Sequence, residues 1–206
     1  IGNLFTSKEH KKITINDLSF KGTTEYISLG HWYNGDYESN RDYKFELNNV
    51  NVIGNEIAIS LSVKVSPAVL VYGNYEFNNV NFYDNKLSEK FNPNGDPVWD
   101  LITNNYSKGT IKNSKIGTIR TYESAVVDIE NTEIKLLQVG SRKGKFGVVT
   151  IKAGTVIDKL VIGMGDAVLN IEEGAIVKEL DYNNKVASKL TLNIAEGTVL
   201  SEVNKK

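Results

Sequence analysis

The chain has 206 residues, with 24 basic and 25 acidic side chains, two histidines and no cysteine. Opposite charges are interspersed and the net charge is −1 at pH 7, so the sequence predicts no nucleic acid partner. The absence of cysteine excludes a disulfide framework and a thiolate zinc site. The longest fully apolar run, residues 68–72 (AVLVY), is far too short for direct membrane insertion.

Residues 1–12 precede any recognisable repeat, and we expect them to form an N-terminal cap or linker. A six-residue pattern then recurs: apolar, polar, two turn-like or small residues, polar, apolar. Its copies are 15–20 (INDLSF), 47–52 (LNNVNV), 77–82 (FNNVNF), 111–116 (IKNSKI), 129–134 (IENTEI), 151–156 (IKAGTV), 171–176 (IEEGAI) and 194–199 (IAEGTV). The last five copies lie on a period of about 20 residues, and the first three steps are about ten residues longer.

A short period built from β-rich segments predicts a solenoid with one coil for each repeat. Alternation of apolar and polar residues, as in residues 57–65, is typical of a strand with one buried face. We therefore predict an all-β chain with almost no helix, folded over residues 1–206 as one single-stranded solenoid of about eight coils. Loop insertions at 21–46 and 83–108 would explain the longer early steps, and residues 109–203 would form the regular coils.

Stacking the copies predicts which residues lie above one another. The third position is Asp or Asn in the first five copies, which suits a tight bend and amide hydrogen bonds between coils. The second position alternates in sign, which places opposite charges side by side; its members are Lys112, Glu130, Lys152 and Glu172. The apolar first and sixth positions predict two interior columns: Ile111, Ile129, Ile151 and Ile171 in one, and Ile116, Ile134, Val156 and Ile176 in the other.

The copies FNNVNF and IENTEI, together with the column of asparagines, resemble the coil turns of right-handed parallel β-helices of the pectate-lyase-like superfamily. The resemblance covers about residues 13–203. It implies a right-handed coil, which is also the general preference of parallel crossovers. The superfamily includes polysaccharide lyases, glycoside hydrolases, phage tailspikes and surface adhesins.

Enzymes of the superfamily that the sequence resembles have carboxylates clustered in a groove. These carboxylates act together with calcium and a basic residue, or together with a histidine. Glycoside hydrolysis in general needs two carboxylates across the scissile bond. This sequence departs from that pattern, since it has no Asp-Asp pair, no Gly-His-Gly, and only His10 and His31 as histidines. Its one adjacent acidic pair is Glu172 and Glu173, and the charge column already explains Glu172. We therefore assign no catalytic residue.

Aromatic residues concentrate in the two predicted insertions, where a rigid scaffold would present loops for binding. Residues 30–43 read GHWYNGDYESNRDY. Aromatic faces suit the C–H faces of sugars, so we expect a binding role for Trp32, Tyr33, Tyr37 and Trp99. The alternative is that these rings pack the loops onto the flank of the solenoid as small satellite cores.

Two further groups are candidates for ligand contacts. Arg120 and Tyr122, followed by Glu123, lie on an otherwise alternating strand (IRTYESAV) and are expected to form a groove site, unless they are an ordinary solvated face. A basic cluster at residues 142–145 (RKGK) predicts a Gly-flanked turn that contacts an anionic glycan, unless it is a solvated loop.

The spacing of oxygen-bearing side chains in the first insertion raises calcium as a ligand. These residues are Asn34, Asp36, Glu38, Asn40 and Asp42. The segment lacks the Gly and terminal Glu of an EF-hand, and on a strand such residues would diverge from an ion. We therefore expect no cofactor, with calcium as the alternative.

The favoured function is a non-catalytic binding or adhesion module, secreted or at the surface of a bacterium, that recognises a glycan or an extracellular protein surface through its loop aromatics. The chain starts at Ile1 without Met, and we expect it to be part of a larger multidomain protein. The alternative is a polysaccharide lyase or glycoside hydrolase with an atypical groove site. A third hypothesis is a structural stalk.

Overall fold

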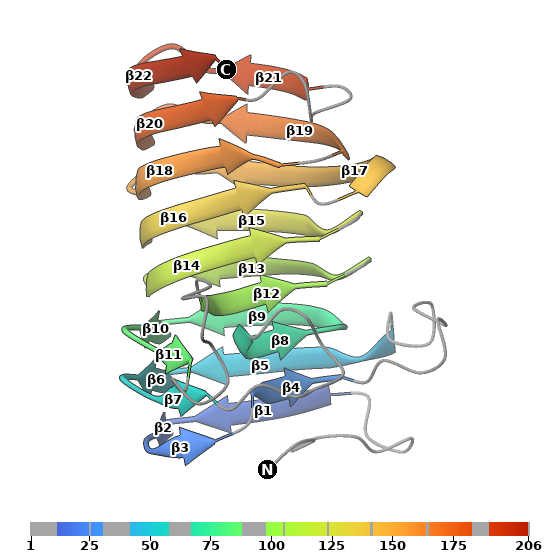
Figure 1. The fold of residues 1–206 in the computed structure, drawn as a ribbon, viewed down its shortest axis with the longest axis vertical. Helices are drawn as coiled ribbons and strands as arrows, with labels where there is room; N and C mark the ends of the chain where they lie inside the picture. Colours follow the sequence, from blue (N-terminus) through green and yellow to red (C-terminus); the bar gives the residue numbers. More distant parts are fainter. Residues whose placement is uncertain are drawn as a thin grey trace.

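The computed structural model describes residues 12–24, 26–30, 42–57, 67–87, 98–104, 106–122, 124–140, 142–163, 165–182 and 190–205. Apart from a 3₁₀ residue at Asp42, every regular element in these ranges is a β-strand, and all paired strands run parallel. The strands stack along one axis, with the first and last described coils at opposite ends (Figure 1). The predicted all-β class and parallel β-helix are confirmed.

The strands form two large sheets and one small sheet. The first sheet has eight strands, in the order β1 (Lys12–Asn16), β5 (Lys44–Asn48), β9 (Asn74–Asn78), β13 (Lys108–Lys112), β15 (Val126–Glu130), β17 (Arg142–Ile151), β19 (Gly165–Ile171) and β21 (Leu190–Ile194).

The second sheet has eleven strands. Its main path is β2 (Ser19–Phe20), β6 (Asn51–Ile53), β10 (Asn81–Tyr83), β14 (Lys115–Thr121), β16 (Glu133–Val139), β18 (Val156–Ile162), β20 (Ile176–Tyr182) and β22 (Val199–Lys205). A branch joins it through β14: β12 (Trp99–Thr103), β8 (Pro67–Val71) and β4 (Ile27–Leu29). The small sheet holds β3 (Thr23–Thr24), β7 (Glu56–Ile57) and β11 (Lys86–Leu87).

Each six-residue copy spans the end of a strand in the first sheet, a corner, and the start of a strand in the second sheet. The first positions of successive copies pair in register, from Ile15 through the whole sheet to Ile194. In-register parallel strands place equivalent side chains directly above one another. The predicted column of Ile111, Ile129, Ile151 and Ile171 is therefore confirmed, and these side chains are buried.

The second predicted column is wrong from the sixth copy onward. Ile116 pairs with Ile134 as expected, but Ile134 then pairs with Ile157. Ile157 is buried, whereas Val156 is only half-buried and pairs with Glu133, an exposed residue of β16.

The length of the corner explains this change of face. In the fifth copy the left-handed residue is Asn131, at the third position, with a φ of 46°. In the sixth copy it is Gly154, at the fourth position, with a φ of 75°. The corner is thus one residue longer, and a shift of one residue turns every side chain of the following strand to the other face.

The asparagine column has both predicted properties. The third-position residues of the first five copies adopt left-handed φ angles between 46° and 57°: Asp17, Asn49, Asn79, Asn113 and Asn131. Amide hydrogen bonds join the coils, from Asn49 to Asp17 (2.8 Å), from Asn79 to Asn49 (2.7 Å) and from Asn131 to Asn113 (2.7 Å). The one departure is Asn113, which donates to Asn78 beside the column.

The segments 21–46 and 83–108 are not simply loops. Their described parts contain β3 and β4 in the first segment and β11 and β12 in the second. These strands are two to five residues long, too short to show a clear alternation in the sequence. The early coils are longer because they carry additional strands on their circumference.

A buried polar column runs through these longer coils. Asn55 donates to the side-chain oxygen of Asn85 (3.1 Å), and Asn85 donates to Asp100 (2.7 Å). Asp100 also accepts from the backbone N–H of Thr118 (2.9 Å). Burial raises the pKa of Asp100, and the hydrogen bonds from Asn85 and Thr118 oppose that shift. Asp100 thus ends this buried polar column where the small sheet ends at β11.

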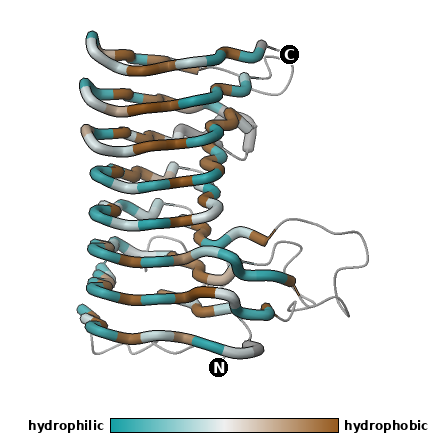
Figure 2. Tube along the Cα trace, turned by 90° about the vertical axis from the view of Figure 1, so that its left-hand side faces the viewer, coloured by the Kyte–Doolittle hydropathy of each residue, from teal (hydrophilic) through white to brown (hydrophobic). Residues whose placement is uncertain are grey.

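The main core is one continuous cluster along the inside of the solenoid. Hydrophobic and hydrophilic segments alternate along the coils (Figure 2). Tyr75 is buried, and its ring lies over Gly109, where an added Cβ would be 2.5 Å from the ring. Glycine is therefore the residue that makes room for the tyrosine.

The register of the second sheet can be tested with two neighbouring residues. Ile157→Ala should lower the free energy of unfolding by about 2–5 kcal/mol, because it leaves a cavity in the core. Val156→Ala should cost about 1 kcal/mol or less, because that side chain faces outward. Urea denaturation of both variants measures the difference. If Val156→Ala lowered the free energy of unfolding more than Ile157→Ala, the register expected from the sequence alone, with Val156 in the core, would be correct.

Candidate ligand-binding site

The predicted binding residues fall into two groups. Trp32, Tyr33 and Tyr37 lie within 31–41, outside the described residues, and their proposed role stays a prediction. Trp99 lies in β12, Arg120 lies in β14, and Tyr122 follows β14 directly.

The structure brings Trp99, Arg120 and Tyr122 together. The Arg120 guanidinium carbon lies 5.5 Å from the centroid of the Trp99 ring and 4.6 Å from that of Tyr122. Cations are attracted to the faces of aromatic rings at such distances. Trp99 is only 7% exposed, so its ring supports Arg120 and offers little face of its own. Tyr122 and Arg120 are half-buried.

Strand pairing sets this arrangement. Leu101 pairs with Ile119 and Ile102 with Arg120, so Arg120 points to the same side as Ile102. Leu101 and Ile119 belong to the main core, whereas Ile102 belongs to a second cluster with Leu70 and Trp99. The second cluster therefore lies on the outer face of the sheet. Four half-buried side chains pack against this cluster: Tyr26, Tyr72, Tyr122 and Leu136.

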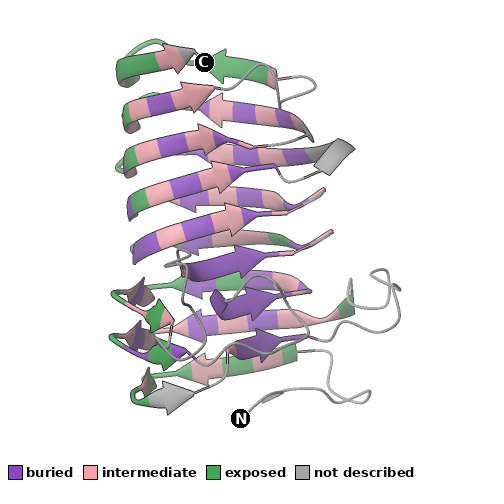
Figure 3. Cartoon of the chain, viewed as in Figure 1, coloured by how far each residue is buried: buried purple, intermediate pink, exposed green. Residues whose placement is uncertain are grey.

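Strands β8 and β12 are buried on both faces for this reason, with all five residues of each strand buried (Figure 3). Their sequences, PAVLV and WDLIT, are mostly apolar without strict alternation. Such a run is typical of a strand covered on both sides. The lack of alternation in these two runs is thus a sequence signal for an outer hydrophobic layer.

Two tyrosines lie on one row beside Arg120. The backbone N–H of Asn104 donates to Val71 (2.9 Å), and that of Tyr122 donates to Thr103 (2.8 Å). Tyr72, Asn104 and Tyr122 therefore follow one another on three successive coils, and all three are half-buried. Within this row the ring of Tyr122 lies against the guanidinium of Arg120.

Arg120 differs electrostatically from many of the lysines around it. Its buried Nε has no hydrogen-bond partner, and no ion pair forms at Arg120 among the described residues. Lys152 pairs with Asp128 (2.9 Å), and Lys159 pairs with Glu179 and Asp181 (2.8 Å each). At Arg120 the rings of Trp99 and Tyr122 lie against the guanidinium, where the lysines have carboxylates.

The predicted charge column is present in part. Lys112 and Glu130 form an ion pair at 2.7 Å, and this contact lowers the pKa of Glu130. Lys152, the next member, bonds to Asp128 instead of Glu130. On the neighbouring corner row Lys115 lies 3.6 Å from Glu133.

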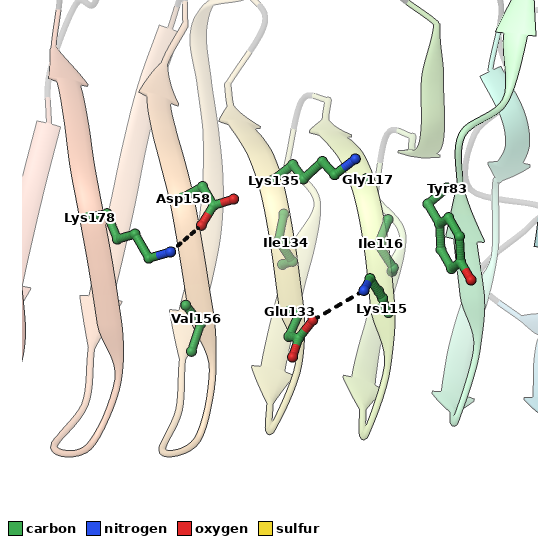
Figure 4. Close-up of a pocket in the computed structure, with 10 residues that line it drawn as sticks. All are labelled: Tyr83, Lys115, Ile116, Gly117, Glu133, Ile134, Lys135, Val156, Asp158 and Lys178. Carbon is green, nitrogen blue, oxygen red and sulfur yellow. Dashed lines mark hydrogen bonds and ion pairs between the residues drawn. The ribbon is translucent and has the colours of Figure 1, made fainter.

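A groove of about 350 Å³ crosses the outer side of β10, β14, β16, β18 and β20 (Figure 4). Its charged walls are largely neutralised, since Lys178 lies 2.7 Å from Asp158 and Lys115 lies 3.6 Å from Glu133. Lys115 also lies 5.6 Å from the centroid of the Tyr83 ring. Its lining comes from one to three residues on each of several separate coils, so no single stretch of sequence indicates the groove.

Two carboxylates lie side by side on the outer face of the first sheet. Glu46 pairs in register with Glu76, and both line a hollow of about 460 Å³. Lys44 lies between them, 3.1 Å from Glu46 and 2.8 Å from Glu76, and Lys12 lies 2.8 Å from Glu46. Hydrogen bonds from Lys12 and Lys44 lower the pKa of Glu46 to about 2. A general acid needs a pKa near the working pH, so Glu46 is unsuited to protonate a leaving group.

The other sequence predictions for this region fare differently. Arg142, Lys143 and Lys145 lie in strand β17, so the predicted turn is wrong; β17 accommodates them with a register irregularity between Arg142 and Phe146. Glu172 and Glu173 are both exposed. The calcium hypothesis rests mainly on residues 34–40, outside the described residues.

Within the described ranges, no three His, Cys, Asp or Glu side chains come together in a way that could hold a metal ion. The same ranges contain no helix long and apolar enough to cross a membrane.

Comparisons with known proteins add little. No family model matches the sequence, and no curated protein matches it. A search of solved structures returns the crystal structure of a TibC-catalyzed hyper-glycosylated fragment of TibA, at 10% identity. That alignment covers 100% of this chain and 95% of the other, with a TM-score of 0.16. A TM-score this low does not support a structural relationship between the two proteins.

Tryptophan fluorescence can test the Arg120 arrangement. In a Trp32→Phe variant Trp99 is the remaining tryptophan, and its emission should be shielded from acrylamide because the ring is buried. Adding Arg120→Ala should increase quenching, whereas Lys112→Ala on the first sheet should not. Equal quenching of Trp99 with and without the Arg120 side chain would show that Arg120 does not cover the Trp99 ring. The reverse variant, Trp99→Phe, reports whether Trp32 is exposed.

An NMR titration can test the carboxylate pair. Glu46 should titrate at about 2. Lys44→Met should raise that pKa toward the ordinary value of 4.5, with Lys12 retaining part of the shift. Because the pKa is lowered in the folded chain, Glu46 stabilises it fully above about 4.5, and this contribution is lost as pH falls toward 2. A measured pKa near neutrality would instead suit a catalytic acid.

Proposed function

We propose that this chain is a non-catalytic glycan-binding module of a secreted or cell-surface bacterial protein. The observation that carries the proposal is the position of the Arg120 guanidinium between the rings of Trp99 and Tyr122. Tyr122 offers a half-exposed ring to the C–H face of a sugar, and Arg120 offers N–H donors to its oxygens.

The rigid scaffold supports this proposal. Arg120 and Tyr122 are fixed by a parallel sheet and by a second hydrophobic cluster, so little conformational freedom is lost when a ligand binds. Asn104 lies on the row beside Tyr122. The predicted contribution of Trp32, Tyr33 and Tyr37 from the adjoining insertion belongs to the same proposal.

The finer family resemblance is also a proposal. The coil turns with their left-handed asparagines support membership of the pectate-lyase-like superfamily and a right-handed coil. A polysaccharide lyase or glycoside hydrolase is the second candidate, since Glu46 and Glu76 are neighbouring carboxylates. The lowered pKa of Glu46 and its two lysine contacts favour the binding module over the enzyme.

A glycan-array and extracellular-matrix screen, followed by titration of the best ligand, tests the proposal. Tyr122→Ala and Trp32→Ala should each weaken binding by about 1–3 kcal/mol, as loss of a central aromatic anchor does at interfaces. Lys112→Ala, an exposed ion-paired residue on the first sheet, is the control and should leave binding unchanged.

Turnover separates the two candidate functions. Incubation with the bound polysaccharide should release no unsaturated sugar detectable by ultraviolet absorbance and no reducing ends. Release that Glu76→Gln abolishes would support the enzyme and contradict the binding module. If Tyr122→Ala and Arg120→Ala both bound the glycan with wild-type affinity, Arg120 and Tyr122 would not be part of the binding site.

A further inference from the structure

The buried polar column changes its chemistry at Asp100. Within the column the side-chain oxygen of Asn85 accepts from the backbone N–H (3.0 Å) and the amide (3.1 Å) of Asn55. The Asn85 amide donates onward to Asp100 Oδ1 (2.7 Å), and from the other side the backbone N–H of Thr118 donates to Asp100 Oδ2 (2.9 Å). Asp100 thus meets donors on both sides. A carboxylate accepts with both oxygens, whereas an amide has only one acceptor oxygen.

The same residue attaches the start of β12 to β14. The register pairs of the two strands begin at Leu101, which lies opposite Ile119. One residue earlier, the backbone N–H of Asp100 donates to the hydroxyl oxygen of Thr118 (2.8 Å), and the carboxylate accepts from the backbone N–H of Thr118 in return. Asp100 therefore extends the connection between the two strands beyond their ladder.

Trp99 lies next to this connection, at the first position of β12. Its pairing partner on β8 is Pro67, and a proline has no N–H to donate to a ladder. The Trp99 ring belongs to the second hydrophobic cluster and lies 5.5 Å from the Arg120 guanidinium. We propose that Asp100 is a positioning residue, whose carboxylate fixes the start of β12 on β14 and so holds the Trp99 ring against Arg120.

Gly117 of β14 supports this proposal independently. An added Cβ at Gly117 would collide with Oδ2 of Asp100. A glycine inside a strand often marks the close approach of another group, and it gives up a side chain that could pack. β14 thus leaves out a side chain at the place that the carboxylate occupies, so both strands specify where Asp100 lies.

The consequence for ligand binding rests on the function proposed above. Arg120 lies in β14 and Tyr122 directly after it, whereas Trp99 lies in β12. Without the Asp100 contacts Trp99 should move away from Arg120. Glycan binding should then weaken roughly tenfold, as loss of an outer-shell partner weakens binding at metal sites.

The fluorescence of Trp99 in a Trp32→Phe background tests the proposal without a ligand. Asp100→Asn keeps the size of the side chain but turns an amide N–H toward the donors of Asn85 or Thr118, and Gly117→Ala crowds the carboxylate. Each variant should raise the acrylamide quenching of Trp99 and shift its emission to longer wavelength.

Two controls separate a change of position from a loss of stability. Gly147→Ala is the matched control for Gly117→Ala, because the nearest neighbour of an added Cβ at Gly147 is a backbone oxygen 3.8 Å away. Ile157→Ala opens a cavity in the core two coils from β14 and destabilises the fold there. Both should leave the quenching of Trp99 unchanged.

Unchanged quenching in Gly117→Ala or in a folded Asp100→Asn would overturn the proposal, and so would an equal rise in Ile157→Ala. Circular dichroism shows whether each variant is folded, and Gly117→Ala decides alone if Asp100→Asn is not. Glycan titration separates this inference from the proposed function. If the wild type binds no glycan, the proposed function fails while the Trp99 measurements still decide the role of Asp100. Wild-type affinity in a variant that exposes Trp99 would contradict a role of Asp100 in binding.

Discussion

The in-register stacking of parallel strands is the constraint on which the rest of this structure depends. Each coil can lie on the next only if its corner returns the backbone to the same place. In five coils a single Asp or Asn in the left-handed region does this, and in the later ones a glycine one position further along does it. The amide hydrogen bonds between Asn49 and Asp17, and between Asn131 and Asn113, then tie neighbouring corners together.

The extra strands of the early coils give the molecule its uneven cross-section. The small sheet ends at β11, where Asp100 takes the place of the next asparagine in the buried polar column. Beside it, β8 and β12 carry apolar residues on both faces, and their outer faces form the second hydrophobic cluster. Arg120 and Tyr122 lie at the border of that cluster, so the proposed binding face is a consequence of the change in coil length.

Charge has a different part in each region. Along the first sheet and the corner rows, lysines lie beside carboxylates of neighbouring coils, and these pairs fix little beyond local register, since exposed ion pairs are weak. At Arg120, among the described residues, aromatic rings lie against the guanidinium in place of a carboxylate.

The sequence by itself determined the repeat, the parallel β-helix, the left-handed asparagines and the interior column through Ile151. These follow from local rules, because corner geometry and alternation depend on residues close together in the chain. The tertiary structure decided that Ile157 replaces Val156 in the core, since one added corner residue is visible only once strands are paired. It also decided that Arg120 meets Trp99, a contact across 21 positions that depends on the pairing of β12 with β14. Contacts between coils depend on which strands are neighbours, and no short stretch of sequence carries that information.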